Sequence, residues 1–399
     1  MEAELVVARC RELAAVTDEP GRTTRAFGGP AMARANELVG RWMAEAGMAV
    51  GVDAARNLVG SLPGADLDAG TLLLGSHLDT VRDAGAFDGP LGVLAAIAAV
   101  ARLRAEDVTL PYGVDVLGFS DEEGLRFGTA YLGSRAVAGT LDAEVLDVAD
   151  ADGVTVRAAL GGDAADASRR GERLVGYLEV HIEQGPVLEE RDAPVAVVEA
   201  IAGATRATLR FRGRAGHAGT VPMALRRDAA CAAAELVLAV EDAARSEPGL
   251  VATVGRLEAL PGAPNVIPGE ALASLDVRHA DDAVRERAVA ALRERAEAIA
   301  ARRAVALDWE QRLATRAVTM DAGLTGRLAA AVRAAGLPEV RLPSGAGHDA
   351  VALAPLLPVS MLFVRCAGGV SHHPDESVAV ADVAAALDVL DRFLRGLAG

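Results

Sequence analysis

The stretch TLLLGSHLDTVRDAGAFDGPLGV, from Thr71 to Val93, decides the fold class. It starts as a short apolar run, passes His77 and a turn rich in glycine and aspartate, and enters the helix-like segment Leu91–Leu103. Two more apolar runs, Gly113–Glu123 and Val175–Gly185, also end in acidic or histidine residues. Strands that alternate with helices predict an α/β domain with a mostly parallel central sheet. In such sheets ligands bind beyond the carboxyl ends of the strands, where these polar residues fall.

The order of predicted strands and helices changes between about Ala204 and Leu313. The order strand, helix, two strands, helix, strand is the βαββαβ pattern of a split-βαβ unit. We therefore expect an inserted α+β domain at residues 206–315, between two parts of the first domain at 1–205 and 316–399. The expected elements are strands at Thr205–Arg212, Leu250–Glu258, Glu270–Arg278 and Ala304–Glu310, and helices at Ala224–Arg245 and Asp282–Arg302. A strand at Val359–Arg365 and a helix at Val380–Leu397 follow in the last part.

Composition excludes several classes of function. The 399 residues carry a formal net charge of −16, so the basic footprint needed for nucleic acid or an anionic membrane is missing. No apolar run approaches the ~20 residues of a membrane-spanning helix. The N-terminal segment lacks the pattern of a signal peptide, and the three cysteines form no CxxC pair. We expect a cytoplasmic protein without disulfides or a cysteine-based zinc site.

Residues able to bind a metal concentrate at the predicted strand ends. His77 can offer a neutral imidazole, and Asp79 can accept the other ring N–H and fix the tautomer. Asp88 lies in a glycine-flanked turn, where its carboxylate could bridge two cations. At the next strand end Glu122 and Glu123 are adjacent carboxylates, which repel each other unless a cation or a shared proton separates them. Taken singly, each segment could equally be a solvated acidic turn.

The remaining histidines, except His279, follow the same trend. His181 ends the third apolar run, where a core histidine is the alternative, and His217 stands between glycines in the insertion. His348 and the pair His372 and His373 lie in glycine-rich segments near the end. Mixed imidazole and carboxylate ligands suit zinc, manganese or cobalt better than magnesium or calcium. No nucleophile elbow, P-loop or dinucleotide-binding GxGxxG follows a predicted strand.

The chain resembles the M20 metallopeptidase-like amidohydrolases in their carbamoylase branch, which holds N-carbamoyl-L-amino-acid hydrolases, β-ureidopropionases and allantoate amidohydrolases. Seven motifs carry the resemblance in order along nearly the whole chain: GSHLDTV, FDGPLGV, DEEGLRFG, EVHIEQGPVLE, GxAGHAGTVPM, NVIPG and GxSHxPxE. The match is specific for the branch and less specific for the substrate. It implies a homodimer in which the inserted domain acts as lid and dimerisation domain.

The resemblance also implies a role for each matching residue. His77, Asp88 and His181 would bind one divalent metal ion, and Asp88 would bridge to a second ion bound by Glu123 and His372. Histidine at position 181, where peptidase members use a carboxylate, is a mark of the branch. Glu122 would be the general base, and His217 would reach a partner subunit's site and stabilise the oxyanion. Substrate-binding positions would be Gln184, Asn265, Arg278, Gly347 and His348.

The expected reaction is hydrolysis of a ureido group in a small carboxylate substrate, with release of ammonia and carbon dioxide. Allantoate is slightly favoured over N-carbamoyl-L-amino acids as the substrate. A dipeptidase or N-acyl-amino-acid hydrolase is the alternative within the family, and a non-catalytic small-molecule-binding dimer is the alternative outside it. One departure from the motif, the second histidine of SHHPDE, makes His373 a competitor of His372 as a ligand.

Overall fold

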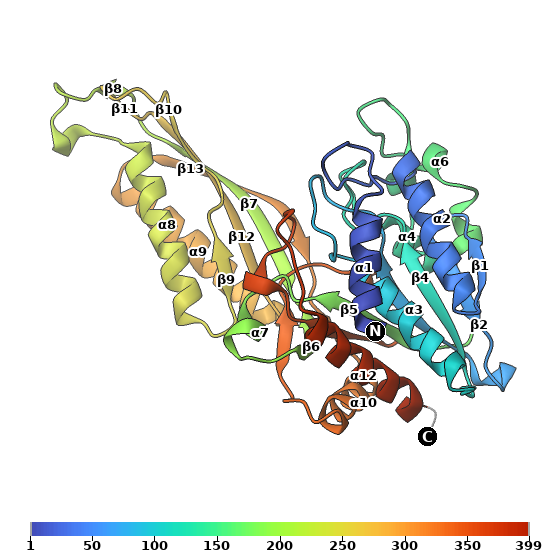
Figure 1. Ribbon diagram of the computed structural model, residues 1–399. Helices are drawn as coiled ribbons and strands as arrows, with labels where there is room; N and C mark the ends of the chain where they lie inside the picture. Colours follow the sequence, from blue (N-terminus) through green and yellow to red (C-terminus); the bar gives the residue numbers. More distant parts are fainter. Residues whose placement is uncertain (1, 398–399) are drawn as a thin grey trace. The chain divides into compact units, whose positions relative to one another are not determined.

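A computed structural model describes residues 2–397, which divide into two compact units (Figure 1). The first unit comprises Met1–Glu199, Met320–Leu342 and Ala346–Gly399. The second comprises Ala200–Thr319 and Pro343–Gly345. The second unit is therefore inserted in the sequence of the first, and its limits lie a few residues outside the expected 206–315. Strand pairing explains the shift, because β7 starts at Gly203 and Ala202 N–H donates to the carbonyl of Ser344.

The first unit holds most of a nine-stranded sheet with the order β1-β2-β4-β3-β5-β16-β6-β14, in which β15 also pairs with β6 and β14 falls in the second unit. Four central strands are parallel, so their carboxyl ends meet at one edge: β3 (Thr71–His77), β4 (Gly113–Phe119), β5 (Leu174–Ile182) and β16 (Val359–Val364). They are buried along most of their length, which suits their nearly continuous apolar sequences. The outer strands are β1 (Ala49–Val52), β2 (Leu58–Leu62), β6 (Val195–Ile201), β14 (Val318–Thr319) and β15 (Arg341–Ser344).

Helix α3 (Pro90–Ala105) is the central helix of this unit. It is apolar on all sides and buried along most of its length, packing on β3 and β5 beneath α1 (Glu2–Ala14) and α12 (Val380–Leu397). Helix α10 (Ala322–Ala334) packs against α12, and α2 (Pro30–Glu45) against β1 and β2. The short helices are α4 (Leu132–Val137), α5 (Ala143–Leu146), α6 (Val156–Ala159), α7 (Val187–Glu190) and α11 (Asp349–Leu353). Among the helices of residues 2–397, none is long and apolar enough to cross a bilayer.

The second unit has an antiparallel sheet with the order β10-β12-β7-β13, and β9 pairs with β12. Side chains of β12 alternate between buried and half-buried, and the buried face packs against helices α8 and α9. The elements are β7 (Gly203–Arg212), α8 (Ala229–Ser246), β9 (Val251–Thr253), β10 (Leu257–Leu260), β12 (Glu270–His279), α9 (Asp282–Arg302) and β13 (Ala306–Thr315). A separate pair is formed by β8 (Gly216–His217) and β11 (Val266–Ile267). The predicted fold class, a mostly parallel central sheet with an α+β insertion, is confirmed.

Two predicted elements of the insertion were wrong in detail. Helix α8 begins at Ala229 and not at Ala224, because Asp228 caps it by accepting the backbone N–H groups of Ala230 and Cys231. Residues 223–225 form a separate 3₁₀ turn after Pro222. The strand expected at Leu250–Glu258 is split into β9 and β10, with Gly255 between the two pieces. Alanine-rich and alternating patterns do not mark such interruptions.

Candidate metal centre

The candidate centre lies at the carboxyl edge of the parallel strands. His77 is the last residue of β3, and His181 lies one residue before the end of β5, so the parallel pairing of the two strands brings the rings to 5.8 Å between centroids. Asp88 comes from the turn that leads from β3 into α3. Gly89 has φ 83°, and a Cβ there would lie 2.5 Å from the His77 ring. Glycine is therefore needed for this turn to pass so close to the imidazole.

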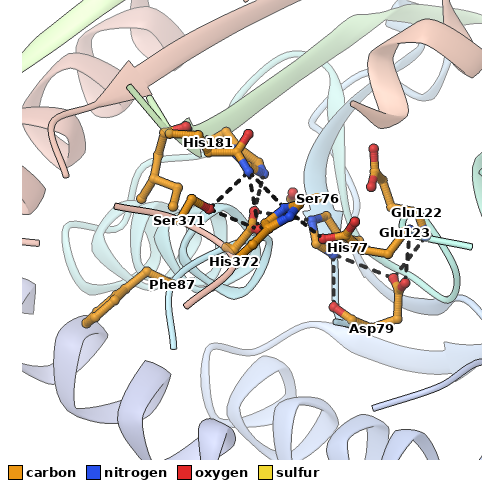
Figure 2. Close-up of polar contacts among 12 residues, drawn as sticks. Ser76, His77, Asp79, Phe87, Glu122, Glu123, His181, Ser371 and His372 are labelled. Atoms are coloured by element: carbon orange, nitrogen blue, oxygen red, sulfur yellow. Dashed lines mark hydrogen bonds and ion pairs between the residues drawn. The ribbon is translucent and has the colours of Figure 1, made fainter. Parts of the chain in front are cut away.

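Asp88 is the centre of two groups of ligand atoms. The inner group is His77, Asp88 and His181, and the outer group is Asp88, Glu123 and His372. Oδ1 of Asp88 lies 3.1 Å from Nε2 of His181 and 3.7 Å from Nε2 of His77. Oδ2 lies 3.1 Å from Nε2 of His372, which is 3.4 Å from Oε1 of Glu123 (Figure 2). Each oxygen of the Asp88 carboxylate thus faces a different group of ligand atoms.

Hydrogen bonds to the inner histidines set their tautomers. Nδ1 of His77 donates to the carbonyl oxygen of Asp79 at 3.0 Å, and Nδ1 of His181 donates to that of Ile182 at 2.9 Å. A neutral ring then carries a lone pair on Nε2, which points at the Asp88 carboxylate. A lone pair and a carboxylate oxygen this close require a proton or a cation between them. The donor set therefore fits a metal ion that binds imidazole nitrogen and carboxylate oxygen.

The pKa shifts of these residues also indicate a site for positive charge. Burial opposes charge on Asp88, yet its contacts with His181, His372 and His77 hold its pKa well below the usual range. Burial likewise opposes the charged form of His77, but Asp79 and Asp88 hold the pKa of this ring well above its usual value. Contact with Asp88 raises the pKa of His372, and burial raises that of Glu123 to about 7. Positive charge is thus stabilised at this position, whether protons or cations supply it.

Asp79 lies at Nδ1 of His77 and makes further contacts that the sequence did not predict. The acceptor nearest to Nδ1 of His77 is the backbone carbonyl of Asp79, while its carboxylate oxygen Oδ1 is 3.5 Å away. The two carboxylate oxygens instead accept the backbone N–H groups of Glu122 and Glu123, at 2.9 and 3.1 Å (Figure 2). Asp79 therefore fixes the segment that presents both glutamates. The sequence suggested the partner of His77 but contained no sign of this second contact.

Glu122 lies beside the inner group. One of its carboxylate oxygens falls in a cluster with His77 and Glu123, and the side chain is buried. Burial raises the pKa of Glu122 well above the usual range. The nearby His77 lowers this pKa, and the carboxylates of Glu123, Asp349 and Asp79 raise it further. A buried carboxylate with a raised pKa is suited to accepting a proton near neutral pH.

The adjacent histidines at the end of the chain differ in orientation. His372 adopts a left-handed backbone conformation, φ 55°, which turns its ring toward Asp88 and Glu123. Such a conformation costs a non-glycine residue of order 1–3 kcal/mol and concentrates at functional sites. Nδ1 of His373 instead accepts the backbone N–H of Asp375, so the neutral ring carries its proton on Nε2. Of the two rings, that of His372 lies in the outer group.

The chain matches the model of peptidase family M20/M25/M40 over residues 73–396. It belongs to this family. A probable allantoate deiminase of Oryza sativa subsp. japonica is 43% identical, over 97% of this chain and 87% of that protein. An N-carbamoyl-L-amino acid amidohydrolase of Geobacillus stearothermophilus is 41% identical, over 98% of this chain and 97% of that protein.

A solved structure is also close. An amidase of the hydantoinase/carbamoylase family from Burkholderia multivorans matches with a TM-score of 0.94 at 32% identity, and covers 99% of this chain and 98% of that chain. The resemblance inferred from the motifs is confirmed. Family M20 is metal-dependent, and two of the four candidate metal-binding clusters among residues 2–397 share Asp88.

Residues predicted to bind substrate are distributed over both units of this M20 chain. Gln184, with φ 58°, donates from Nε2 to Oδ2 of Asp88 at 3.2 Å and to Oγ of Ser371 at 3.1 Å. His348 is buried, and its ring stacks edge-on against that of His181 at 4.5 Å. Burial holds the pKa of His348 well below its usual value, so the ring is neutral. A Cβ at Gly347 would collide with the hydroxyl of Tyr131, which explains the glycine.

The other three predicted residues belong to the second unit. Pairing of β8 with β11 places His217 opposite Val266, and the N–H of Ala218 donates to the carbonyl of Asn265. Nδ1 of His217 accepts the N–H of Gly219 at 3.0 Å, so a neutral ring carries a proton on Nε2 and can donate from there. Arg278 makes a two-point contact with Asp276, through Nε at 2.8 Å and Nη2 at 2.9 Å.

Arg278 also lines a cavity of about 780 Å³ within the second unit. Arg206 and Arg312 line it as well, and Arg206 shares the Asp276 carboxylate through Nε at 2.8 Å. Asp276 lines the cavity too, and Arg312 pairs with Glu310, so carboxylates of the chain already balance much of this positive charge.

Sequence reasoning missed several buried polar residues near the centre. Glu179 accepts from Ser76 Oγ and from Ala350 N, and its signal was an acidic residue inside an apolar strand. Ser371 and Glu376 were fixed letters of the GxSHxPxE motif, yet no role was assigned to them. Both contact the turn that carries Asp88.

Proposed function

We propose that this chain hydrolyses a ureido C–N bond in a small carboxylate substrate, with two divalent metal ions bound around Asp88. The single observation that carries the proposal is the convergence of the inner and outer ligand groups on that one carboxylate. Relatives that align along nearly the whole chain are named allantoate deiminase and N-carbamoyl-L-amino acid amidohydrolase. The net reaction converts one ureido group and one water into an amine, carbon dioxide and ammonia.

The ligands would be His77 and His181 for the inner ion, Glu123 and His372 for the outer ion, and Asp88 for both. Zinc, manganese and cobalt all suit this donor set. Two such ions lower the pKa of water and polarise a carbonyl. His348 is neutral and packs on the His181 ring, which excludes water from that side of the inner group.

Glu122 is the proposed general base. Its carboxylate lies beside the inner group, and burial raises its pKa well above the usual range. It would take a proton from the attacking water and deliver it to the departing nitrogen. Asp79 holds the backbone of Glu122 in place for this transfer.

Both units would supply the remaining substrate contacts. Arg278 of the insertion would bind the substrate carboxylate, with Asn265 of the insertion and Gln184, Gly347 and His348 of the first unit around the rest of the substrate. The Nε2–H of His217 would donate to the oxygen that becomes negative during attack, in the site of a partner subunit. We propose a homodimer in which the insertion serves as lid and dimerisation domain. A cytoplasmic location is consistent with the three free cysteines.

Ammonia release tests the reaction. The metal-free protein is reconstituted separately with zinc, manganese and cobalt, and assayed with allantoate, several N-carbamoyl-L-amino acids, N-carbamoyl-β-alanine and a set of dipeptides. We expect ammonia from one ureido substrate and none from the dipeptides. Glu122→Gln is the matched control, which should bind both metals and lose about 10²–10⁴-fold in turnover. Peptide cleavage without ammonia would reject the proposed reaction and leave a dipeptidase.

Mixed dimers test the shared site. Glu122→Gln and His217→Ala subunits, each almost inactive alone, should regain part of the activity when combined. In the mixed dimer one of the two sites would contain an intact Glu122 and an intact His217. A proven heterodimer without recovered activity would place His217 in its own subunit's site.

A further inference from the structure

Glu376 connects two parts of the chain that are far apart in sequence. It lies between β16 and α12, and its side chain is only 5% exposed. Oε1 accepts the backbone N–H groups of Phe87 and Asp88, at 2.7 and 3.0 Å. Oε2 accepts the hydroxyl of Ser371 at 3.1 Å. The same carboxylate therefore binds the turn that carries Asp88 and the loop that carries His372.

The molecule makes specific room for this contact. A Cβ at Gly85 would lie 2.3 Å from Cβ of Glu376 and 2.5 Å from its Oε1. Since Gly85 has no positive φ, the backbone itself does not require glycine there. The absent side chain is thus explained by the close approach of Glu376.

The outer group has reason to need such support. His372 lies on a loop in an unfavourable left-handed conformation, which persists only where surrounding contacts hold it. Its ring is 48% exposed, whereas the rings of His77 and His181 are 2% exposed and lie on strands. Ser371, the residue before His372, contacts both Glu376 and Oδ2 of Asp88.

We propose that Glu376 is a positioning residue for the outer metal ion, a role that rests on the two-metal function proposed above. It fixes the turn of Asp88 and the loop of His372 on one carboxylate, and so sets the separation of the two ligands. Removing it leaves two buried backbone N–H groups without an acceptor and frees both segments. The inner ligands His77 and His181 are held by their own strands and backbone carbonyls, so their ion is affected least.

The hydrogen-bond pattern predicts which substitutions are tolerated. Glutamine at position 376 can still accept both N–H groups with its carbonyl oxygen. Its amide can donate to Oγ of Ser371, whose own proton then goes to Asp88. Aspartate is one methylene shorter and cannot reach both sides. Glu376→Gln should therefore behave like the unchanged protein, and Glu376→Asp like Glu376→Ala.

The test measures metal binding and not only activity. Equilibrium dialysis against zinc or manganese gives stoichiometry and dissociation constants for Glu376→Ala, Glu376→Gln and Gly85→Ala. Gly51→Ala is the matched glycine control, because a Cβ there meets nothing within 4 Å. We expect two ions in the unchanged protein, and a 10–100-fold weaker second ion in Glu376→Ala and Gly85→Ala. Glu376→Gln and Gly51→Ala should remain within about threefold of the unchanged protein, well under that loss.

The outcomes separate this inference from the proposed function. If Glu376→Ala and Gly85→Ala bind both ions with unchanged constants, even with a lower melting temperature, Glu376 is a structural residue only. Gly85→Ala keeps the Glu376 carboxylate but displaces it. Its metal binding therefore tests the positioning role if Glu376→Ala does not fold. If the unchanged protein binds fewer than two ions, the proposed two-metal function fails, and the inference fails with it.

Discussion

The inner and outer groups around Asp88 use similar ligands in different settings. His77 and His181 are buried at strand ends, and each donates from Nδ1 to a backbone carbonyl. His372 is half exposed, lies on a loop and has a left-handed backbone. A rigid, dry site loses little freedom on binding an ion, whereas a loop must be held in place. The comparison predicts a tightly bound inner ion and a more easily removed outer ion.

The largest effect is expected from His181→Ala. This change removes an inner ligand and leaves Oδ1 of Asp88 with His77 alone, so the inner ion should be lost and kcat should fall by about 10³-fold or more. Metal analysis and ammonia release measure the two effects. His373→Ala is the matched histidine control, because its ring is exposed and lies outside both ligand groups. An inner ion retained by His181→Ala would break the distinction between the groups.

A smaller effect is expected from His372→Ala. It should remove the outer ion, leave the inner ion bound, and lower kcat by about 10²-fold, because one source of charge stabilisation remains. Titration with a chelator should show the same order in the unchanged protein, with one ion leaving before the other. Simultaneous loss of both ions from His372→Ala would mean that Asp88 couples the two groups into a single unit.

The difference between the groups also marks what the sequence could predict. The strands β3 and β5 and the positions of His77 and His181 at their ends followed from apolar runs that end in histidine, because parallel strands align their carboxyl ends. The position of His372 came from the motif alone. The loop of His372 is joined to the turn of Asp88 through Glu376, whose contacts with Phe87 and Asp88 span almost 300 residues, and no local pattern encodes them.

The same reasoning explains the errors in the insertion. Helix propensity extended α8 back to Ala224, but the cap at Asp228 and the turn after Pro222 decided its start. Asp79 was expected to contact His77 with its carboxylate, which lies 3.5 Å from Nδ1 and also accepts the backbone N–H groups of Glu122 and Glu123. Hydrogen-bond partners depend on the tertiary fold, whereas strand and helix periods are local.

A moderate effect is expected from pH, and it should fall on the outer group. Burial raises the pKa of Glu123 to about 7, so below that pH the metal must displace a proton. Through Glu123 alone, affinity for the outer ion should drop by up to tenfold for each pH unit below 7, and protonation of His372, whose pKa is also raised by contact with Asp88, should make the drop steeper. In the metal-free protein the sign is opposite. The protonated carboxyl stabilises the fold fully below pH 4.5, and this contribution is lost as the pH rises through about 7.

Calorimetric titration with manganese between pH 5.5 and 8.5 measures this dependence. Glu123→Gln provides the comparison, since its side chain no longer titrates. An outer-ion affinity that does not change across this range in the unchanged protein would mean that Glu123 is already ionised at pH 5.5. Burial would then not raise its pKa to about 7.

The smallest effect is expected from His373→Ala, the neighbour of His372. The His373 ring is 59% exposed, and its Nδ1 accepts the N–H of Asp375, which leaves the proton on Nε2. As a ligand it would have to give up that contact or that proton, and neither ring nitrogen is in the outer group. Metal content and kcat should therefore stay within about twofold of the unchanged protein, within the range of ordinary surface substitutions. If His373→Ala lost an ion and His372→Ala bound both ions, then His373 and not His372 would be the ligand of the outer ion.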